Sequence, residues 1–253
     1  GPNGIEAMSP DGNPAAVPPG FDLEGEELVL SPDGTRVAFM NTGRPQNVYV
    51  ANADGSNPRR VSNNPIIDRS PAWSPDGRWL AYSANRDASW WTINIVDVNG
   101  DNTRTLYGEY ALSYEPFWSP DGQRVGFISM NNVDYQAGIY VVDVGSGSVT
   151  RLIPDVGLTR FLSWSPDGNR IVYSPAIGIS SSEVYLIDAD GSYPHRLVRA
   201  GLFQGTSSPV WSPNSKYIAF GAIEDSGWNM YLIDVNGNDL VRLGSGAPIM
   251  WMR

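Results

Sequence analysis

Short runs of alternating apolar and polar residues recur along the chain and are separated by turn-forming residues. One example reads PAWSPDGRWLAYS, residues 71–83, in which two such runs flank the turn Ser74-Pro75-Asp76-Gly77. Alternation with a period of two is typical of half-buried β-strands, and no segment of ten or more residues keeps the 3.6-residue period of an amphipathic helix. The pattern therefore predicts an all-β protein.

The Ser-Pro-Asp-Gly turn is repeated at a nearly constant spacing. Copies begin at Ser31, Ser74, Ser119 and Ser165, and a degraded copy, SPNS, begins at Ser212, so that successive copies lie 43, 45, 46 and 47 residues apart. A period in this range is typical of a β-propeller, in which each blade is a four-stranded sheet. Because proline fixes φ at the second turn position and Asp-Gly tolerates positive φ, we interpret the turn as architectural.

Each repeat predicts four antiparallel strands, a to d. A large apolar residue precedes the turn, two alternating strands follow it, and a second turn leads to a short fourth strand. We expect the tryptophans before the turn to wedge between neighbouring blades: Trp73, Trp118, Trp164 and Trp211. We expect the arginines near the end of strand d to bridge blades: Arg151, Arg196 and Arg242. The predicted blades span approximately residues 28–63, 71–108, 116–153, 162–199 and 209–243.

The two ends of the chain resemble further pieces of the repeat. Residues 5–17 align with residues 48–61, which supply strands c and d, and Pro248–Trp251 aligns with Ser208–Trp211, the start of a blade. We therefore expect a sixth blade, built from residues 5–18 plus 247–253 and lacking a complete strand b, that closes a ring by pairing the two ends. A five-bladed ring with loose ends is the alternative. On either interpretation residues 1–253 form a single domain.

The pattern W-S-P-D-G, then R-h-A-F/Y (h, apolar), then h-Y-h-h-D-x-x-G, then R-L resembles the TolB-like β-propeller repeat, which is itself similar to the WD repeat. The resemblance covers nearly the whole chain and is specific for fold rather than function. It implies an extracytoplasmic protein, periplasmic or secreted, that acts as an envelope scaffold, receptor or sensor module. The extra amino-terminal α/β domain of TolB has no counterpart among these residues.

The charge and composition exclude several classes of partner. The formal net charge of −10 argues against nucleic-acid binding, which needs a basic surface. No run of about 18 apolar residues is present, so we expect no membrane insertion. The absence of cysteine excludes disulfides and Cys-ligated zinc. We expect a monomer whose acidic loops suit a basic protein or peptide partner.

The b–c and d–a loops of the predicted blades vary most in sequence, and a rigid scaffold most often carries its function on such loops. Exposed aromatic side chains there would contact a partner, because buried aromatic anchors dominate binding interfaces. Packing between neighbouring loops is the alternative. The candidate partner-binding residues are Trp90, Trp91, Tyr110, Tyr135 and Trp228.

A second candidate site is the mouth of the predicted central channel, at the start of the innermost strands. Charged groups and a phenol that converge there could bind a small polar ligand, a peptide terminus or a divalent cation such as calcium. No other cofactor and no dedicated metal site is expected. A solvated channel with mutually cancelling ion pairs is the alternative. The residues are Glu26, Glu27, Asp68, Arg69, Tyr114, Glu115 and Arg160.

These features favour a non-enzymatic module that docks a protein or polymer partner on its b–c and d–a loops. The one histidine, His195, lies in a predicted c–d turn, so a histidine-based catalytic triad is not expected, and no catalytic residue is assigned. The alternative is an enzyme at the channel mouth, a metal-assisted hydrolase or lyase that acts on a small anionic or saccharide substrate.

Overall fold

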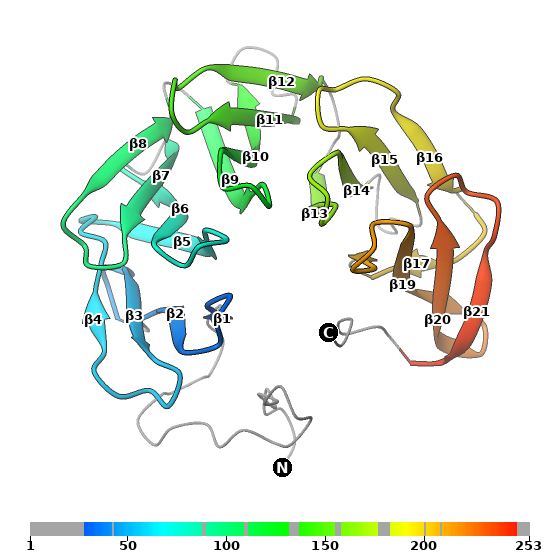
Figure 1. Cartoon of the computed structure of the whole chain (residues 1–253), viewed down its shortest axis with the longest axis horizontal. Helices are drawn as coiled ribbons and strands as arrows, with labels where there is room; N and C mark the ends of the chain where they lie inside the picture. Colours follow the sequence, from blue (N-terminus) through cyan, green and yellow to red (C-terminus); the bar gives the residue numbers. More distant parts are fainter. Residues whose placement is uncertain are drawn as a thin grey trace. The chain divides into compact units, whose positions relative to one another are not determined.

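The computed structural model describes residues 28–41, 43–87, 90–108, 111–131, 137–154, 158–176, 183–199, 201–207 and 209–246. All the regular secondary structure within these ranges consists of β-strands, as the alternating pattern predicts (Figure 1). The described residues fall into two compact units that divide between Pro116 and Phe117. The expected sixth blade, residues 5–18 with 247–253, lies outside the described residues.

The first unit contains two complete four-stranded antiparallel sheets. The first sheet consists of β1 (Val29–Leu30), β2 (Arg36–Met40), β3 (Val48–Asn52) and β4 (Arg59–Arg60). The second sheet consists of β5 (Ile67–Trp73), β6 (Trp79–Asn85), β7 (Trp91–Asp97) and β8 (Thr103–Tyr107). In each sheet the strands pair in chain order, so every strand is antiparallel to its neighbour.

Three more sheets repeat this meander. The third consists of β9 (Ala111–Trp118), β10 (Arg124–Asn131), β11 (Ala137–Asp143) and β12 (Val149–Ile153). The fourth consists of β13 (Leu158–Trp164), β14 (Arg170–Ala176), β15 (Val184–Asp188) and β16 (His195–Val198). The fifth consists of β17 (Gly205–Thr206), β18 (Val210–Trp211), β19 (Tyr217–Glu224), β20 (Gly227–Asp234) and β21 (Val241–Ser245). Its first strand is divided into β17 and β18, both of which pair with β19.

The repeated turn is held by its own side chains. In the first sheet Ser31 Oγ donates to Asp33 Oδ1 at 2.6 Å and accepts a hydrogen bond from the Arg36 amide at 2.9 Å. The same two bonds recur at Ser74, Ser119 and Ser165, and at Ser212 the Asn214 amide oxygen takes the place of the aspartate. The hydrogen bond from Ser31 is the main reason that the pKa of Asp33 falls to about 2. The turn is therefore architectural, as predicted.

The tryptophan before the turn packs against the preceding sheet in the second and fifth sheets. The Trp73 indole N–H donates to the Val29 carbonyl oxygen at 2.9 Å, and the Trp211 N–H donates to Ser163 at 3.2 Å. An arginine of the preceding sheet covers the ring, since the Arg36 guanidinium lies 5.1 Å from the Trp73 ring centre. The predicted wedge is confirmed at both tryptophans.

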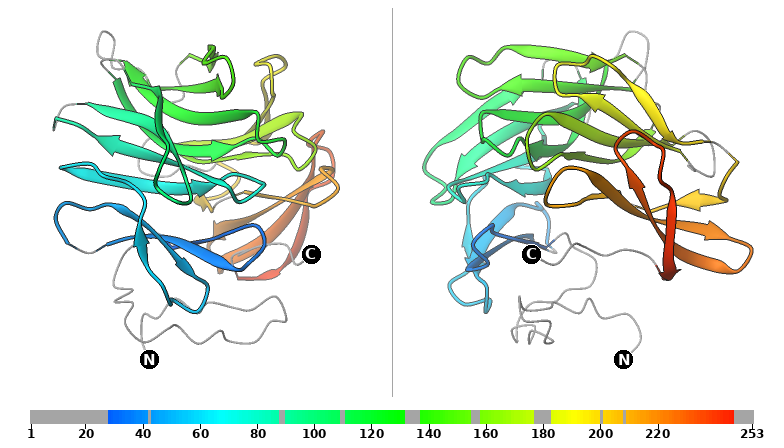
Figure 2. Two further views of the ribbon diagram at one scale, coloured as in Figure 1. Left: turned by 60° about the vertical axis from the view of Figure 1, so that its left-hand side comes forward. Right: turned by 45° about the vertical axis from the view of Figure 1, so that its right-hand side comes forward.

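The cores between sheets follow from this packing. In the first unit the facing sides of the first and second sheets form one apolar cluster, and Figure 2 shows these sheets against each other in blue and cyan. In the second unit the fourth and fifth sheets form another cluster. The members of the second cluster are Val172, Val184, Leu186, Leu197, Val198, Phe203, Trp211, Ile218, Phe220, Ala222, Tyr231 and Ile233.

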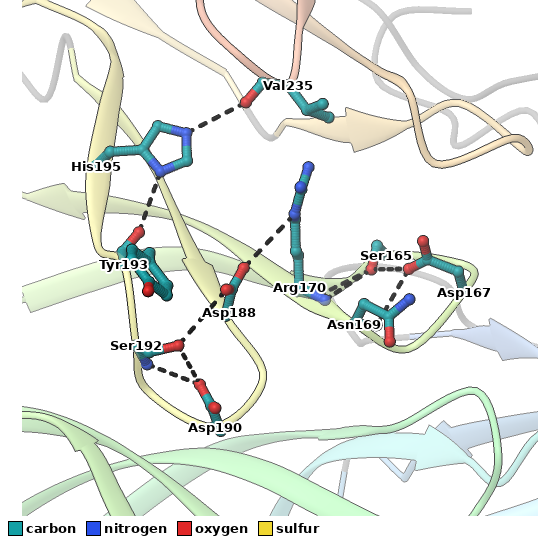
Figure 3. Close-up of polar contacts among 10 residues, drawn as sticks. All are labelled: Ser165, Asp167, Asn169, Arg170, Asp188, Asp190, Ser192, Tyr193, His195 and Val235. Atoms are coloured by element: carbon teal, nitrogen blue, oxygen red, sulfur yellow. Dashed lines mark hydrogen bonds and ion pairs between the residues drawn. The ribbon is translucent and has the colours of Figure 1, made fainter.

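The second turn of each repeat also contacts the preceding sheet. A Cβ built on Gly191 would lie 3.4 Å from the Leu152 carbonyl oxygen, and Gly191 has a φ of 90°, so glycine suits both the close approach and the backbone there. His195 is placed at the same end of the fourth sheet, with its ring nitrogens 3.1 Å from the Tyr193 carbonyl oxygen and 3.2 Å from that of Val235 (Figure 3). Its contacts are those of a structural tie between the fourth and fifth sheets.

The arginines near the end of strand d differ from the expectation. Arg196 pairs with Glu183 at 2.9 Å, Arg242 donates to Asn229 at 2.5 Å, and Arg151 lies over the Tyr140 ring at 5.6 Å. In each pair both residues belong to one sheet or to its adjoining loop. The prediction that these arginines bridge blades is wrong, because their contacts lie within their own sheet.

Asp68, in β5, is a fully buried carboxyl group between the first and second sheets. Ser62 donates a hydrogen bond to Asp68 Oδ2, whereas Oδ1 has no hydrogen-bond partner in the described part of the chain. Burial raises the pKa of Asp68 to about 6, against hydrogen bonds from Ser62 and Asn64 that lower it. Tyr82, on β6, lies close enough that burial and the Asp68 charge both raise the pKa of its phenol.

We predict that Trp211→Ala lowers the free energy of unfolding by about 3–5 kcal/mol, because it empties a buried site between two sheets. Urea unfolding followed by circular dichroism measures the change. Trp228→Ala is the matched control, since Trp228 is 42% exposed, and it should change stability by less than about 1 kcal/mol. Equal losses in the two variants would contradict the wedge role of Trp211.

We predict that Asp68→Asn stabilises the protein at neutral pH but not at pH 4. The folded protein binds the Asp68 proton more tightly than the unfolded chain, so the wild type loses stability as the pH rises from about 4 to about 6. The difference between variant and wild type should grow through this window by up to about 3 kcal/mol and then level off. Urea unfolding at a series of pH values measures it, and a difference independent of pH would contradict the buried, uncompensated charge.

Candidate functional site

The b–c and d–a connections emerge at one end of each sheet, which we call its loop side. Two hollows in the described residues lie there, one in each unit. The first, which we call the second-sheet hollow, lies in the first unit and has a volume of about 900 Å³. Its lining residues are Arg86, Asp87, Trp90, Thr92, Thr105, Leu106, Tyr107 and Gly108. A volume in this range fits a small molecule or a few residues of a peptide.

Trp90 is held in the wall of this hollow by the loop between β6 and β7. Its amide donates to Asp87 Oδ1 at 3.1 Å, and its carbonyl oxygen accepts a hydrogen bond from the Arg86 amide at 3.2 Å. The side chain is half-buried, so part of it is available to a ligand. Tyr107, at the end of β8, also lines the hollow, where two aromatic side chains therefore occur together.

A directed chain of hydrogen bonds lies beneath the hollow. Arg86 Nη2 donates to Thr105 Oγ1 at 2.9 Å, Thr105 Oγ1 donates to Asn94 Oδ1 at 2.7 Å, and Asn94 Nδ2 donates to Thr92 Oγ1 at 2.7 Å. Thr92 Oγ1 in turn donates to the Ala84 carbonyl oxygen at 3.3 Å. Thr92 and Asn94 are buried, so the chain anchors the Arg86 guanidinium to the interior of the second sheet.

Trp91, the neighbour of Trp90, points to the other face of β7. The Arg69 guanidinium lies 5.9 Å from its ring centre, and the Trp91 side chain is half-buried. Trp91 also pairs with Leu112 in a parallel bridge between β7 and β9. These contacts suit the packing role that the sequence left open for Trp91.

The predicted channel-mouth residues differ in burial and in their contacts. Asp68 is enclosed, Arg69 covers Trp91, Tyr114 has a buried hydroxyl group without a hydrogen-bond partner in the described residues, and Glu115 is exposed. Arg160 lies in β13, and the structure does not describe its side chain. Glu26 and Glu27 lie outside the described residues, so the convergence of the whole set stays a prediction.

The innermost strands of the second and third sheets share a backbone irregularity near these residues. Ser70 and Glu115 both adopt left-handed φ values, 53° and 54°, three residues before Trp73 and Trp118. In β5 the pairing with β6 shifts register between Arg69 and Ala72. Such bulges redirect side chains, which explains why alternation along the sequence could not give the direction in which Asp68 points.

The second hollow, about 540 Å³, lies on the loop side of the fifth sheet. Glu224 and Asp225 line it together with Leu202 and Phe203. Both carboxylates already accept hydrogen bonds, Glu224 from Tyr231 and Asp225 from Gln204, the latter at 2.8 Å. Trp228 lies near this end on β20 and is exposed, whereas Tyr110 and Tyr135 lie outside the described residues.

The described residues contain no group of three His, Cys, Asp or Glu side chains arranged to hold a metal ion. They likewise include no helix of the length and apolar character that would cross a membrane. Four side chains that line or support the second-sheet hollow were not singled out from the sequence: Arg86, Asn94, Thr105 and Tyr107. They come from β7, β8 and the loop after β6, and only the strand register brings them to one face.

Comparisons with known proteins agree with this architecture. Residues 87–246, more than half of the chain, match the family model of the TolB beta propeller domain. The Tol-Pal system protein TolB of Desulfosudis oleivorans is 47% identical over 53 residues, which cover 21% of this chain and 12% of that protein. The chain therefore matches about an eighth of the length of this curated relative.

Solved structures show the same fold at low sequence identity. A protein described as TolB from Agrobacterium tumefaciens is similar with a TM-score of 0.67 and 24% identity, over 86% of this chain and 79% of that one. Oligogalacturonate lyase from Vibrio parahaemolyticus is similar with a TM-score of 0.68 and 14% identity, over 85% and 63%. These likenesses concern the fold, and the family match is the stronger statement. The chain belongs to the TolB β-propeller family.

Proposed function

We propose that this propeller is a non-enzymatic binding module of the bacterial envelope that docks a protein partner on its loop side. The observation that carries the proposal is the second-sheet hollow, where half-buried Trp90 stands beside a guanidinium group anchored from below. An aromatic side chain in a partly enclosed, rigid setting is typical of the residues that dominate binding energy. The relatives' name, Tol-Pal system protein TolB, supports a role within an assembly of envelope proteins, in the periplasm.

The chemistry of the described carboxyl groups favours binding over catalysis. Asp68, the carboxyl group with the raised pKa, is fully buried, so it is not accessible to a substrate as a general base. Glu224 accepts a hydrogen bond from the Tyr231 hydroxyl and Glu183 pairs with Arg196. The enzymatic alternative has the support of the fold likeness to a lyase, which at 14% identity concerns architecture alone.

We predict that Trp90→Ala reduces partner capture at least about tenfold, the loss expected for an interface hot spot. The full chain is immobilised, exposed to an extract of envelope proteins from the same organism, and the bound proteins are quantified by mass spectrometry. Tyr193→Ala is the matched control, because Tyr193 is 79% exposed on the turn at the opposite end of the fourth sheet. Unchanged capture by Trp90→Ala, or an equal loss with Tyr193→Ala, would overturn the proposed docking side.

A further inference from the structure

We propose that the second-sheet hollow recognises a peptide through a carboxylate that lies next to an apolar side chain, with Arg86 as the anion anchor. The inference rests on the proposed function, since it names the chemistry by which the loop side would hold a protein partner. It is carried by three observations: the fixed guanidinium, the aromatic walls and the charge of the surrounding protein.

The Arg86 guanidinium retains free binding capacity. Arginine has five N–H donors, and in the described residues the Arg86 side chain uses Nη2 for its bond to Thr105 Oγ1. Arg86 is exposed and lines the hollow, so its remaining donors are accessible there. A planar fork of N–H groups matches the two oxygens of a carboxylate and binds them more strongly than it binds neutral acceptors.

The hydrogen-bond chain makes this anchor rigid before a ligand arrives. An exposed arginine normally loses side-chain entropy when it binds, and part of that cost is removed where the side chain is already held. Here Thr105 fixes Arg86, and Asn94 and Thr92, both buried, fix Thr105. The direction of the chain, from Arg86 toward the Ala84 carbonyl oxygen, leaves every link satisfied without a ligand.

The walls of the hollow suit the rest of a peptide. Trp90, Leu106 and Tyr107 offer apolar surface beside Arg86, which would cover a flat or branched apolar side chain. Asp87 lines the same hollow, and a carboxylate there can accept a backbone N–H of the ligand. A peptide supplies a carboxylate, an N–H group and an apolar side chain within a few bonds of one another.

The charge of the protein favours a single carboxylate over a polyanion. With a formal net charge of −10, the molecule repels nucleic acids and polyuronates, and one guanidinium cannot offset that repulsion along a charged polymer. A peptide with one carboxylate carries a single negative charge at this site, which the Arg86 guanidinium can balance locally, so the repulsion is far smaller than for a polyanion. The carboxylate could be the carboxyl terminus of the partner or an Asp or Glu side chain, and the test separates these two sources.

Three defined peptides test the proposal with the full chain in 0.15 M salt. They are N-acetyl-Gly-Phe with a free carboxylate, its carboxamide, and N-acetyl-Asp-Phe carboxamide, each titrated by isothermal calorimetry. At least one of the two carboxylate peptides should bind at least about tenfold more tightly than the uncharged carboxamide, since bonds to charged groups are the stronger ones. Binding of the first alone identifies a chain terminus, and binding of the third an acidic side chain.

Substitutions then assign the binding to Arg86. Arg86→Gln should lower the affinity for the carboxylate peptide roughly tenfold or more and leave the affinity for the carboxamide unchanged. Arg104→Gln is the matched control, because it removes the same charge from the same strand as Thr105 but from its other face, and it should change affinity less than about threefold. Circular dichroism melting of each variant verifies that the fold is intact.

Equal affinity for acid and carboxamide, or an unchanged affinity in folded Arg86→Gln, would overturn the inference, as would tighter binding of a polyuronate than of any peptide. The two proposals can fail separately. Capture of an envelope protein that depends on Trp90, with no preference for carboxylate peptides, would leave the proposed function standing and remove this inference. Carboxylate binding at Arg86 without any captured protein would leave this inference standing and remove the proposed function.

Discussion

The contact between one sheet and the next is the interaction on which the described structure depends. A four-stranded sheet of this size cannot bury its apolar faces alone, and in the described residues the first sheet packs against the second and the fourth against the fifth. At these two junctions the tryptophan before the repeated turn contributes to the contact, and the indole N–H groups of Trp73 and Trp211 donate to the preceding sheet. The turn that follows the tryptophan is held by a serine hydroxyl that both donates and accepts a hydrogen bond. The backbone next to the tryptophan is therefore fixed.

The loop side inherits its rigidity from this scaffold. The hydrogen-bond chain under the second-sheet hollow starts at a loop residue, Arg86, and ends at Ala84 in a central strand. Of its intermediate members Thr105 is exposed, whereas Asn94 and Thr92 are buried, so the Arg86 cation is tied to the interior of the sheet through side chains. A loop with this kind of support can present a guanidinium and a tryptophan in one arrangement, which is what a specific binding site requires.

Local features of the sequence predicted the fold well, because they act over short distances. The repeated turn and the alternation of the strands on either side of it depend on residues within about one hairpin, so their spacing alone identifies the sheets. The polar chain from Arg86 to Thr92 was not predicted, because its members are 2 to 19 residues apart on different strands and meet only through register. Asp68 shows the same limit, since the bulge at Ser70 disturbs the alternation that would have given its direction.

The repeated contact also bears on how such a chain can change length. In the second and fifth repeats a tryptophan ring packs on a surface of the preceding repeat, and Gly191 against Leu152 is a similar contact between repeats at the second turn. Duplication of one whole repeat would therefore preserve the contacts with the repeats on either side, and loss of one repeat would join two compatible surfaces. Insertion of part of a repeat would disrupt these contacts, because a tryptophan ring would then meet a surface of the wrong shape. Evolution of this architecture is thus expected to proceed in steps of some 45 residues, as the spacing of the turns in the present chain records.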